Sequence, residues 1–430
     1  MLEELFALET FGIKLGLENI RHLCDALDHP ERTFLSFHIA GTNGKGSVTA
    51  MVHAALVSAG IHTARYTSPH LVHLNERFVV GNTPVDDDTM GQVARDVLDC
   101  ADGLQRDGVL AAPPTFFEAT TAMAFEIFRR KRVQVAVIEV GLGGRFDATN
   151  VLVPPVGAIT SIALDHQQHL GHSLAEIASE KAGIIKPSMT VVCGSLPSVA
   201  LDVMKRVAAE RGATLVEPAR DSRIDYEMEE GRARLTIETE THQYGPMLLA
   251  LRGEHQVGNA VVAVGVLETA SANGVDVPIA AVVQGFETVN WPARLELFQM
   301  SDGTRVLLDA AHNPEGARAL RSYLAAWHPE RPVLVIGVMR DKDAEAIVSE
   351  LLPVTSAVIT TEAATPRAMP ANELASRVKV LDAQRSIAAY VDVRAALTAA
   401  FAHSRTVCVA GSIFLAGTVR ECLRQRGILR

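Results

Sequence analysis

Residues 34–47 read FLSFHIAGTNGKGS, and this stretch decides how the N-terminal half of the chain is expected to fold. The apolar run 34–40 predicts a buried strand, and a helix is expected to start at Val48. Between them, glycines can turn backbone N–H groups towards a phosphate, the helix N-terminus adds positive charge, and Lys45 adds an ammonium. Ser47 is placed to ligate magnesium. The predicted phosphate site comprises Gly41, Thr42, Asn43, Gly44, Lys45, Gly46 and Ser47.

This loop departs from the GxxxxGK[ST] signature, because Gly46 separates Lys45 from Ser47. A glycine-rich connection between a strand and a helix can also be an ordinary tight turn. The preceding strand and the following helix favour the nucleotide interpretation.

The rest of the chain repeats the alternation of short apolar runs with helix-period segments. This pattern predicts an α/β protein with a mostly parallel sheet covered by helices on both faces. Between about residues 213 and 251 the period changes to two, which predicts a small antiparallel insertion on the first sheet. A second α/β series follows Pro292. We therefore expect two domains, 1–291 and 295–430, with a cleft between them.

Composition excludes several classes of protein. The 430 residues are 48% hydrophobic and 21% charged, which is typical of a folded globular protein. The net charge of -10 argues against broad binding of nucleic acid or anionic membrane. Five cysteines without a CxxC pair indicate buried thiols rather than disulfides or a zinc site. With no signal peptide and no apolar run of about 20 residues, the cytoplasm is the expected location.

Two further strands are expected to end in side chains that can hold a metal. The run VQVAVIEV carries Glu139 at its end, and VGAITSIALDHQQHLG is expected to end in Asp165-His166. Ligands of open parallel sheets bind beyond the carboxyl ends of the strands, so these groups are predicted to share one cation. The alternatives are an acid that faces solvent and a structural histidine.

Two more residues are candidates near that edge. The pattern from Ser173 to Glu176 is a capping box, so Lys181 is expected two turns along a short helix. By itself such a lysine would be read as a solvated surface residue. Ser68 follows a third strand in the segment TSPH, where its hydroxyl could instead cap a helix.

Thirteen segments in order give the chain a resemblance to a known family. They are GIKLGLENI, HIAGTNGKGS, TSPHL, LNERF, TFFEA, EVGLGGRFDATN, ALDHQQHLG, EKAGIIK, GEHQVGNA, WPARLE, LDAAHNPEGA, DKD and GSIFLAGTVR. With them the sequence resembles the folylpolyglutamate and dihydrofolate synthases, relatives of the Mur peptide ligases, over essentially its whole length. The resemblance implies a P-loop domain of the Mur central type and a smaller Rossmann-like C-terminal domain. It departs at Ala293, where glycine is common, and it is loose in GIKLGLENI.

The resemblance also implies roles for residues. One magnesium ion would bridge the ATP phosphates near Ser47, and a second would be held by Ser68, Glu139, His166 and a carbamylated Lys181. Lys45, Lys181 and His312 would be catalytic. Adenine, ribose and phosphate would be held by Asn259, Arg294, Asp309, Ala310, Ala311 and His312. The pterin-side substrate would lie against Thr115, Phe116, Phe117 and Glu118, with Phe146, Asp147 and Ala148 opposite.

The implied activity is ATP-dependent addition of L-glutamate to a folate, and also to 7,8-dihydropteroate, through an acyl phosphate. A monomer is compatible with the resemblance. Two alternatives are a synthase that accepts only folates and another Mur-type peptide ligase. The latter would place a nucleotide-sugar domain before the P-loop, and only 40 residues precede Gly41. A third alternative is a P-loop switch that binds ATP to control a partner.

Overall fold

The computed structural model describes residues 2–12 and 16–428. Residues 13–15, within the segment GIKLGLENI, lie outside the described residues. The described chain forms two compact units, and each is treated by itself. The first comprises residues 1–225, 235–247 and 258–289, and the second 226–234, 248–257 and 290–430. No helix in the described ranges is both long enough and apolar enough to cross a membrane.

The first unit is built on an eight-stranded sheet with the order β4-β3-β2-β5-β1-β6-β7-β8. The pairings from β2 to β8 are parallel, whereas β3 and β4 join antiparallel at one edge. The prediction of a mostly parallel sheet is therefore confirmed. The strands are β1 Leu35–Ala40, β2 Thr63–Tyr66, β3 Phe78–Val80, β4 Thr83–Pro84, β5 Val135–Glu139, β6 Val156–Ile159, β7 Thr190–Cys193 and β8 Thr214–Val216.

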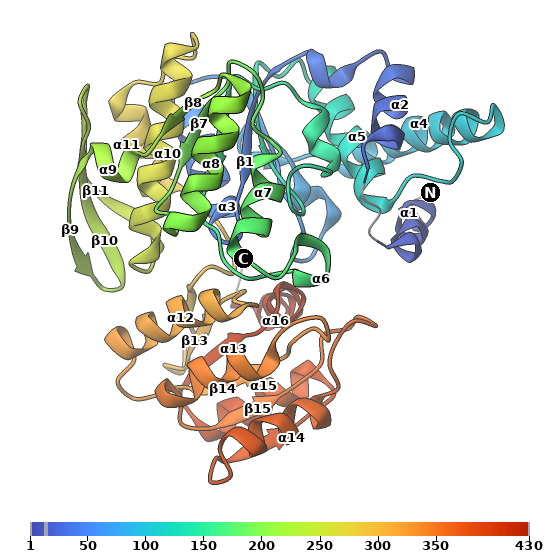
Figure 1. Cartoon of the computed structure of the whole chain (residues 1–430). Coiled ribbons are helices and arrows are strands. Elements are labelled where there is room, and N and C mark those ends of the chain that lie inside the picture. Colours follow the sequence, from blue (N-terminus) through green and yellow to red (C-terminus); the bar gives the residue numbers. More distant parts are fainter. Residues whose placement is uncertain (1, 13–15, 429–430) are drawn as a thin grey trace. The chain divides into compact units, whose positions relative to one another are not determined.

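Helices cover this sheet, and Figure 1 shows α7 and α8 side by side over it. Helices α3 and α11 also pack closely, since a Cβ on Gly285 would lie 2.5 Å from the backbone nitrogen of Ala55. The helices up to the second series are α1 Leu2–Ala7, α2 Glu18–Ala26, α3 Lys45–Ser58, α4 Asp87–Arg106, α5 Phe116–Arg130, α6 Gln167–Leu170, α7 Leu174–Ala182, α8 Ser198–Arg211, α9 Pro218–Asp221, α10 His255–Ala272 and α11 Ile279–Thr288. Single 3₁₀ turns are η1 Leu8–Phe11, η2 Pro30–Arg32, η3 Leu74–Arg77 and η4 Ala148–Val151.

Strand register places the candidate residues at one edge of this sheet. Ile39 of β1 pairs with Glu139 of β5, and Tyr66 of β2 pairs with Ile138. On the other side of β1, Ala40 pairs with Ile159 of β6. The segments that follow these four strands therefore begin at the same level of the sheet. This edge is where ligands of parallel sheets bind.

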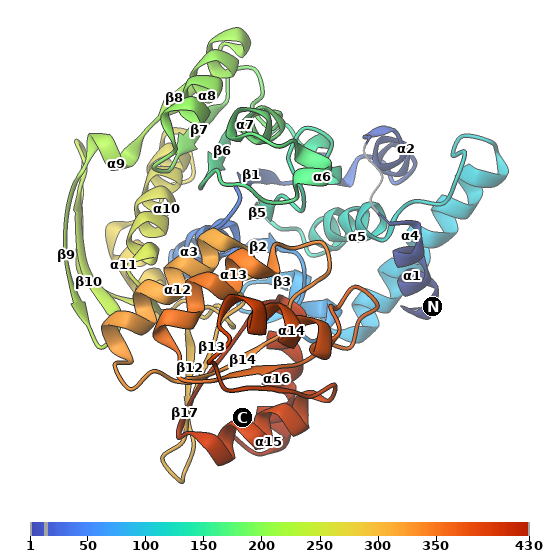
Figure 2. The same ribbon diagram turned by 60° about the horizontal axis from the view of Figure 1, so that its bottom comes forward.

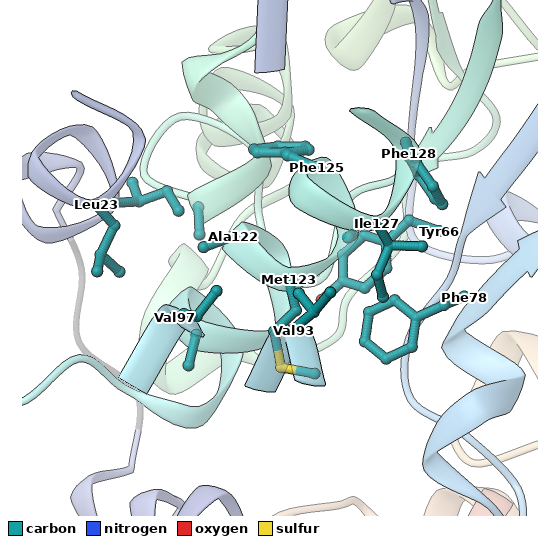
Figure 3. Close-up of a cluster of buried hydrophobic side chains, with 14 of the residues drawn as sticks. Leu23, Tyr66, Phe78, Val93, Val97, Ala122, Met123, Phe125, Ile127 and Phe128 are labelled. Atoms are coloured by element: carbon teal, nitrogen blue, oxygen red, sulfur yellow. The ribbon is translucent and has the colours of Figure 1, made fainter. Parts of the chain in front are cut away.

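An apolar cluster anchors α4 and α5 to β2 and β3. Figure 3 shows Tyr66, Phe78, Val93, Met123 and Phe128 converging in it, and all five are buried. The rings of Tyr66 and Phe78 stack with their centroids 5.7 Å apart. Each fully buried large side chain contributes roughly 1.5–3 kcal/mol to folding. The cluster therefore gives helix α5 a rigid base.

The period-two segment forms a sheet of its own rather than extending the first one. Its strands are β9 Arg223–Glu229, β10 Arg232–Glu238 and β11 Gln243–Arg252, in the order β11-β10-β9. Glu230 and Gly231 connect the first two strands with positive φ angles of 47° and 80°. Two successive positive φ angles are typical of a type I′ hairpin turn.

The second unit carries a six-stranded sheet with the order β12-β13-β17-β14-β15-β16. Only β12 is antiparallel to its neighbour in the described pairings. Figure 2 shows α12 and α13 side by side against it. The strands are β12 Glu296–Gln299, β13 Arg305–Leu308, β14 Val333–Ile336, β15 Val358–Thr360, β16 Ile387–Ala389 and β17 Thr406–Ala410. The helices are α12 Pro314–Trp327, α13 Ala344–Leu351, α14 Ala371–Leu381, α15 Val393–His403 and α16 Ile413–Gln425, and η5 spans Leu352–Val354.

Two element boundaries differ from the sequence expectation. Helix α3 begins at Lys45 rather than Val48, because Gly44 is left-handed with φ 85° and already accepts from the Val48 N–H. Strand β6 ends at Ile159, so Asp165 and His166 lie beyond a loop and not at the strand end. The Thr160 and Ser161 hydroxyls turn to the glycine-rich loop, which ends the strand early.

Candidate active site

The loop between β1 and α3 requires glycine at two positions. Gly41 has φ 149°, and a Cβ there would lie 1.9 Å from the Thr160 hydroxyl oxygen. Gly44 has φ 85°, and a Cβ there would lie 2.4 Å from Oδ1 of Asn259. L-residues rarely adopt such backbone angles, so both conformation and space select glycine. At Gly41 and Gly44 the loop therefore presents main-chain atoms without side chains to a ligand.

Hydrogen bonds tie this loop to residues 160–163, the segment after β6. The Asn43 carbonyl accepts from the Thr160 hydroxyl at 2.6 Å, and the Asn43 N–H donates to the Ser161 hydroxyl at 2.9 Å. Thr42 donates to the Ala163 carbonyl at 3.3 Å and accepts from its N–H at 3.1 Å. The loop is thus held in shape by its neighbour. Sequence reasoning missed Thr160 and Ser161, although a Thr-Ser pair after an apolar run was a usable signal.

Two lysines meet at the start of this loop. Lys45 donates to the carbonyl oxygens of Gly41 and Thr42, both at 3.1 Å. Lys181, which is 4% exposed, donates to the same Gly41 carbonyl at 2.9 Å. Burial, aided by the charge of Lys45, lowers the pKa of Lys181 from 10.5 to about 7. Near neutral pH, Lys181 therefore has a substantial neutral amine population.

Lys181 occupies the place that its capping box predicts. Helix α7 begins at Leu174 after Ser173, whose hydroxyl accepts from the Glu176 N–H at 3.2 Å. Glu176 in turn accepts from the Ser173 N–H at 2.9 Å. The helix then points Lys181 inward rather than to solvent. The surface reading of this lysine is wrong.

Glu139 is the last residue of β5 and is 5% exposed. One of its carboxylate oxygens accepts from the Ser68 N–H at 3.3 Å. The predicted pair of Glu139 and Ser68 is thus brought together at the sheet edge. Ser68 does not cap a helix, since η3 begins later and His73 caps it.

The next candidates, Asp165 and His166, lie in the connection to α6. The His166 N–H donates to the Asp165 carboxylate at 2.8 Å, and its Nε2 lies 3.9 Å from the same oxygen. His166 is left-handed with φ 48°, an angle that is uncommon for non-glycine residues but that histidine adopts more readily than most. Among the described residues, no group of three or more His, Cys, Asp or Glu side chains is arranged as a metal site.

The predicted pterin side is assembled around Gly141. A Cβ on Gly141 would lie 2.5 Å from Cζ of Phe117 and 3.1 Å from Oδ2 of Asp147, so the two predicted walls meet there. Thr115 and Glu118 form a reciprocal cap at the start of α5, with the Thr115 N–H donating to Glu118 at 2.7 Å. Three predicted residues, Phe116, Phe146 and Ala148, complete this face. Phe116 and Ala148 are buried, Phe146 is exposed, and Arg145 lies 5.4 Å from the ring of Phe146.

Asp147 is fixed by a buried network. Its carboxylate accepts from the Leu142 N–H at 2.8 Å, the Thr149 N–H at 3.0 Å and the Thr149 hydroxyl at 2.5 Å. The Thr149 hydroxyl is also 2.7 Å from Nε2 of His38 on β1. Burial raises the pKa of Asp147, whereas these hydrogen bonds oppose the rise. Burial lowers the pKa of His38 to about 3, so this histidine is neutral near pH 7.

The remaining predicted nucleotide residues lie in the second unit, with Arg294 shortly before β12 and the others directly after β13. Asp309 accepts from the Leu295 N–H at 2.9 Å and the Ala311 N–H at 2.8 Å, and burial raises its pKa. Arg294 donates to the Ala293 carbonyl at 2.9 Å, and the Ala310 N–H donates to that same oxygen.

His312 and Ala293 complete this part of the second unit. Nδ1 of His312 lies 2.9 Å from the Ala310 carbonyl. Ala293 has φ 56°, which explains why glycine suits this position better.

Two family models match the chain: the Mur ligase middle domain over residues 107–267, and the Mur ligase glutamate ligase domain over residues 293–413. A dihydrofolate synthase/folylpolyglutamate synthase of Mycobacterium tuberculosis is 34% identical over 94% of this chain and 89% of the relative. The chain belongs to the folylpolyglutamate synthase/dihydrofolate synthase family. A folylpolyglutamate synthase of Lacticaseibacillus casei is 33% identical over 93% of this chain and 92% of the relative.

Solved folylpolyglutamate synthases share the fold. The Mycobacterium tuberculosis folylpolyglutamate synthase complexed with ADP superposes with a TM-score of 0.92, at 33% identity, over 98% of this chain and 97% of that one. Escherichia coli FolC in complex with DHPP and ADP gives 0.87, at 28% identity, over 99% and 98%. The Mur ligase fold inferred from the motifs is thereby confirmed.

Proposed function

We propose that this chain is an ATP-dependent ligase that joins the α-amine of L-glutamate to a carboxylate of a folate, and likewise of 7,8-dihydropteroate. The proposal is supported by relatives named for both activities and by related structures with ADP, or with DHPP and ADP. The observation that carries it for this chain is the meeting of Lys45 and Lys181 at the Gly41 carbonyl.

The reaction requires activation of a carboxylate, which is a poor electrophile. The acceptor carboxylate attacks the γ-phosphorus of ATP, so an acyl phosphate forms and ADP leaves. The glutamate amine then attacks the acyl carbon, the C–O bond to phosphate breaks, and the amine loses one proton. The products are an amide, ADP and phosphate. Here the protein acts mainly by positioning and charge stabilisation.

The glycine-rich loop suits a triphosphate. A Cβ would crowd positions 41 and 44, and the backbone there precedes the positive N-terminus of α3. Lys45 would move its ammonium from the loop carbonyls to the outer phosphates. Asn259 lies against Gly44 and would contact the nucleotide.

In the second unit, Arg294 and the segment Asp309, Ala310, Ala311 and His312 would complete the nucleotide site. His312 would add positive charge near the transferring phosphoryl group. The hydrogen bonds that Asp309 accepts fix the backbone of this segment.

Two magnesium ions would serve the reaction, one near Ser47 and the other near Ser68, Glu139 and His166. Magnesium prefers oxygen ligands, and the Ser68–Glu139 contact at the sheet edge fits that preference. Bound magnesium would neutralise phosphate charge and orient the ATP. Lys181 fits carbamylation, because its neutral amine is available near pH 7 and can react with carbon dioxide. The carbamate would turn a buried cation into an oxygen ligand.

The acceptor would lie on the face formed by Thr115, Phe116, Phe117, Glu118, Phe146, Asp147 and Ala148. Phe117 offers an aromatic surface for a pterin, and Asp147 offers fixed carboxylate oxygens. The buried network through Thr149 holds that carboxylate in one orientation.

The test is ADP release by purified protein with magnesium, ATP and L-glutamate, offered dihydropteroate and tetrahydrofolate separately. We expect turnover with both acceptors and loss of most turnover in Lys181→Ala and His166→Ala. His169→Ala, in the short helix α6 that directly follows His166, is the matched control and should retain activity. ATP turnover without dependence on glutamate would refute the ligase proposal. Turnover with tetrahydrofolate alone would establish a synthase that accepts only folates.

A further inference from the structure

Arg77 is a buried cation in the first unit that the proposed mechanism does not use. It ends η3, directly before β3, and is 6% exposed. Its Nε donates to Nδ1 of His70 at 3.0 Å, and its guanidinium lies 5.1 Å from the ring centre of Phe116. Burial lowers the pKa of His70 to about 4, so His70 is a neutral acceptor and not a counter-ion.

No carboxylate forms an ion pair with Arg77 in residues 2–12 and 16–428. Burial lowers the pKa of Arg77, whereas its hydrogen bond to Tyr66 and the nearby carboxylates of Glu9 and Glu139 favour its charged form. Burying a cation without a paired anion is costly, and arginine stays charged in proteins. Its Nε donates to His70 and the guanidinium also hydrogen-bonds Tyr66, which leaves its remaining N–H groups for a carboxylate.

The loop that carries Arg77 is built to hold it at the candidate site. Glu76 accepts from the N–H groups of Leu71, Val72 and His73 at 2.7, 3.1 and 3.0 Å. The Arg77 carbonyl accepts from the Thr67 N–H at 3.1 Å, directly beside Ser68. The backbone of Arg77 therefore lies beside the segment Thr67–Ser68, and its guanidinium lies against Phe116 of the proposed acceptor face.

The chemistry of the two acceptors differs in one respect that Arg77 can detect. Dihydropteroate has a single carboxylate, and that group must react. A folate ending in glutamate has a second carboxylate, on its terminal residue, that does not react. A fixed guanidinium on the reacting carboxylate would lower its nucleophilicity, but on the second carboxylate it only binds.

We propose that Arg77 binds the non-reacting α-carboxylate of the acceptor's terminal glutamate and so determines selectivity for folyl acceptors over dihydropteroate. This inference rests on the proposed function and deepens it. Arg77 is a substrate-binding residue in this role and takes no part in bond making.

The experiment compares kcat and KM of the wild type, Arg77→Gln and Arg77→Lys with tetrahydropteroylglutamate and with dihydropteroate. We expect Arg77→Gln to raise KM for tetrahydropteroylglutamate roughly 10- to 100-fold, as for a lost charge-assisted hydrogen-bond pair. KM for dihydropteroate should change less than about threefold, since that acceptor lacks the group. Arg77→Lys keeps the charge but lacks the planar guanidinium. Its KM for tetrahydropteroylglutamate should therefore lie between those of the wild type and Arg77→Gln.

A matched control is Arg65→Lys, at a half-buried arginine on β2 beside His53. We expect it to leave the KM ratio of the two acceptors unchanged. If Arg77→Gln does not fold, Arg77→Lys is used to test the proposal. An unchanged ratio of the KM values for the two acceptors in Arg77→Lys overturns the proposal. An equal rise in KM for both acceptors overturns it as well, because a structural role would act on both.

Equilibrium binding separates this inference from the proposed reaction. Titration of the wild type with pteroylglutamate and with pteroate, followed by protein fluorescence, should give tighter binding of the glutamate-bearing ligand. Arg77→Gln should abolish that difference. A wild type that shows the difference but no ADP release would refute the ligase activity and leave the carboxylate site intact.

Discussion

The ammonium groups of Lys45 and Lys181 donate to one acceptor, the carbonyl oxygen of Gly41, at 3.1 and 2.9 Å. Two cations on one neutral oxygen repel each other, and Lys45 accordingly helps to lower the pKa of Lys181. The buried amine of Lys181 is therefore poised to lose its proton at the point where both lysines meet the loop.

Lys45→Met is expected to raise the pKa of Lys181 above about 7, because it removes the neighbouring charge. In the wild type, Lys181 releases its proton in the folded state near pH 7 but in the unfolded state near 10.5, so stability rises with pH between these values. In the variant, the pH range over which stability rises should therefore begin at a higher pH. Urea unfolding from pH 6 to 10 measures it, with Lys181→Met as the control that lacks this group. An identical pH slope in wild type and Lys45→Met would contradict the coupling.

Gly44→Ala should reduce the free energy of unfolding by about 1–2 kcal/mol, because an L-residue there must adopt φ 85°. It should also weaken ATP binding, since its Cβ would displace the side chain of Asn259, a proposed nucleotide contact. Nucleotide titration and urea unfolding measure the two effects. Gly258→Ala is the control, as a Cβ there meets nothing within 4 Å and helix α10 favours alanine. Equal changes in stability and in nucleotide affinity for Gly44→Ala and Gly258→Ala would argue against a strained loop.

Asp147→Asn should lower the free energy of unfolding by about 1–3 kcal/mol, because the amide NH₂ would replace one of the two carboxylate oxygens and face at least one backbone N–H donor. It should also raise KM for the acceptor, as the carboxylate would no longer be held in place. Steady-state kinetics and thermal unfolding test both. The control is Asp392→Asn. Asp392 caps α15 in the second unit, and asparagine is an equally good cap, so the free energy of unfolding should change little.

His38→Gln should make the protein less sensitive to acid. Burial holds the pKa of His38 at about 3 in the folded state, against 6.5 when exposed, so only the unfolded state gains this proton between those values. The wild type therefore loses stability as pH falls through this window, at most about 1.4 kcal/mol per pH unit from this group. Urea unfolding at pH 4, 5, 6 and 7 should show a shallower slope in the variant. An unchanged slope would mean that His38 is charged in the folded protein.

The sequence was sufficient to predict the elements that carry the site. Apolar runs and glycines predicted β1 and its loop, and the Ser173–Glu176 pattern predicted α7 and the position of Lys181 on it. Local patterns predict such features because they depend on residues close in the chain.

What the sequence did not predict depends on contacts between distant segments. Strand β6 was expected to continue to Asp165, yet the Thr160 and Ser161 hydroxyls end it by bonding the loop. The short strand β16 was missed, since three half-buried residues give no clear period. Arg77 carries no local signal of burial, because its environment is made by His70 and Phe116.

The shared register of β1, β5 and β6 also has a consequence for how the chain folds. Ile39 pairs with Glu139, and the bond from Lys181 to Gly41 spans 140 positions. Contacts of such long range close large loops and form slowly. During synthesis the contact between the phosphate loop and Lys181 can therefore form only after α7 has left the ribosome. A nascent chain that ends before α7 lacks part of the candidate active site.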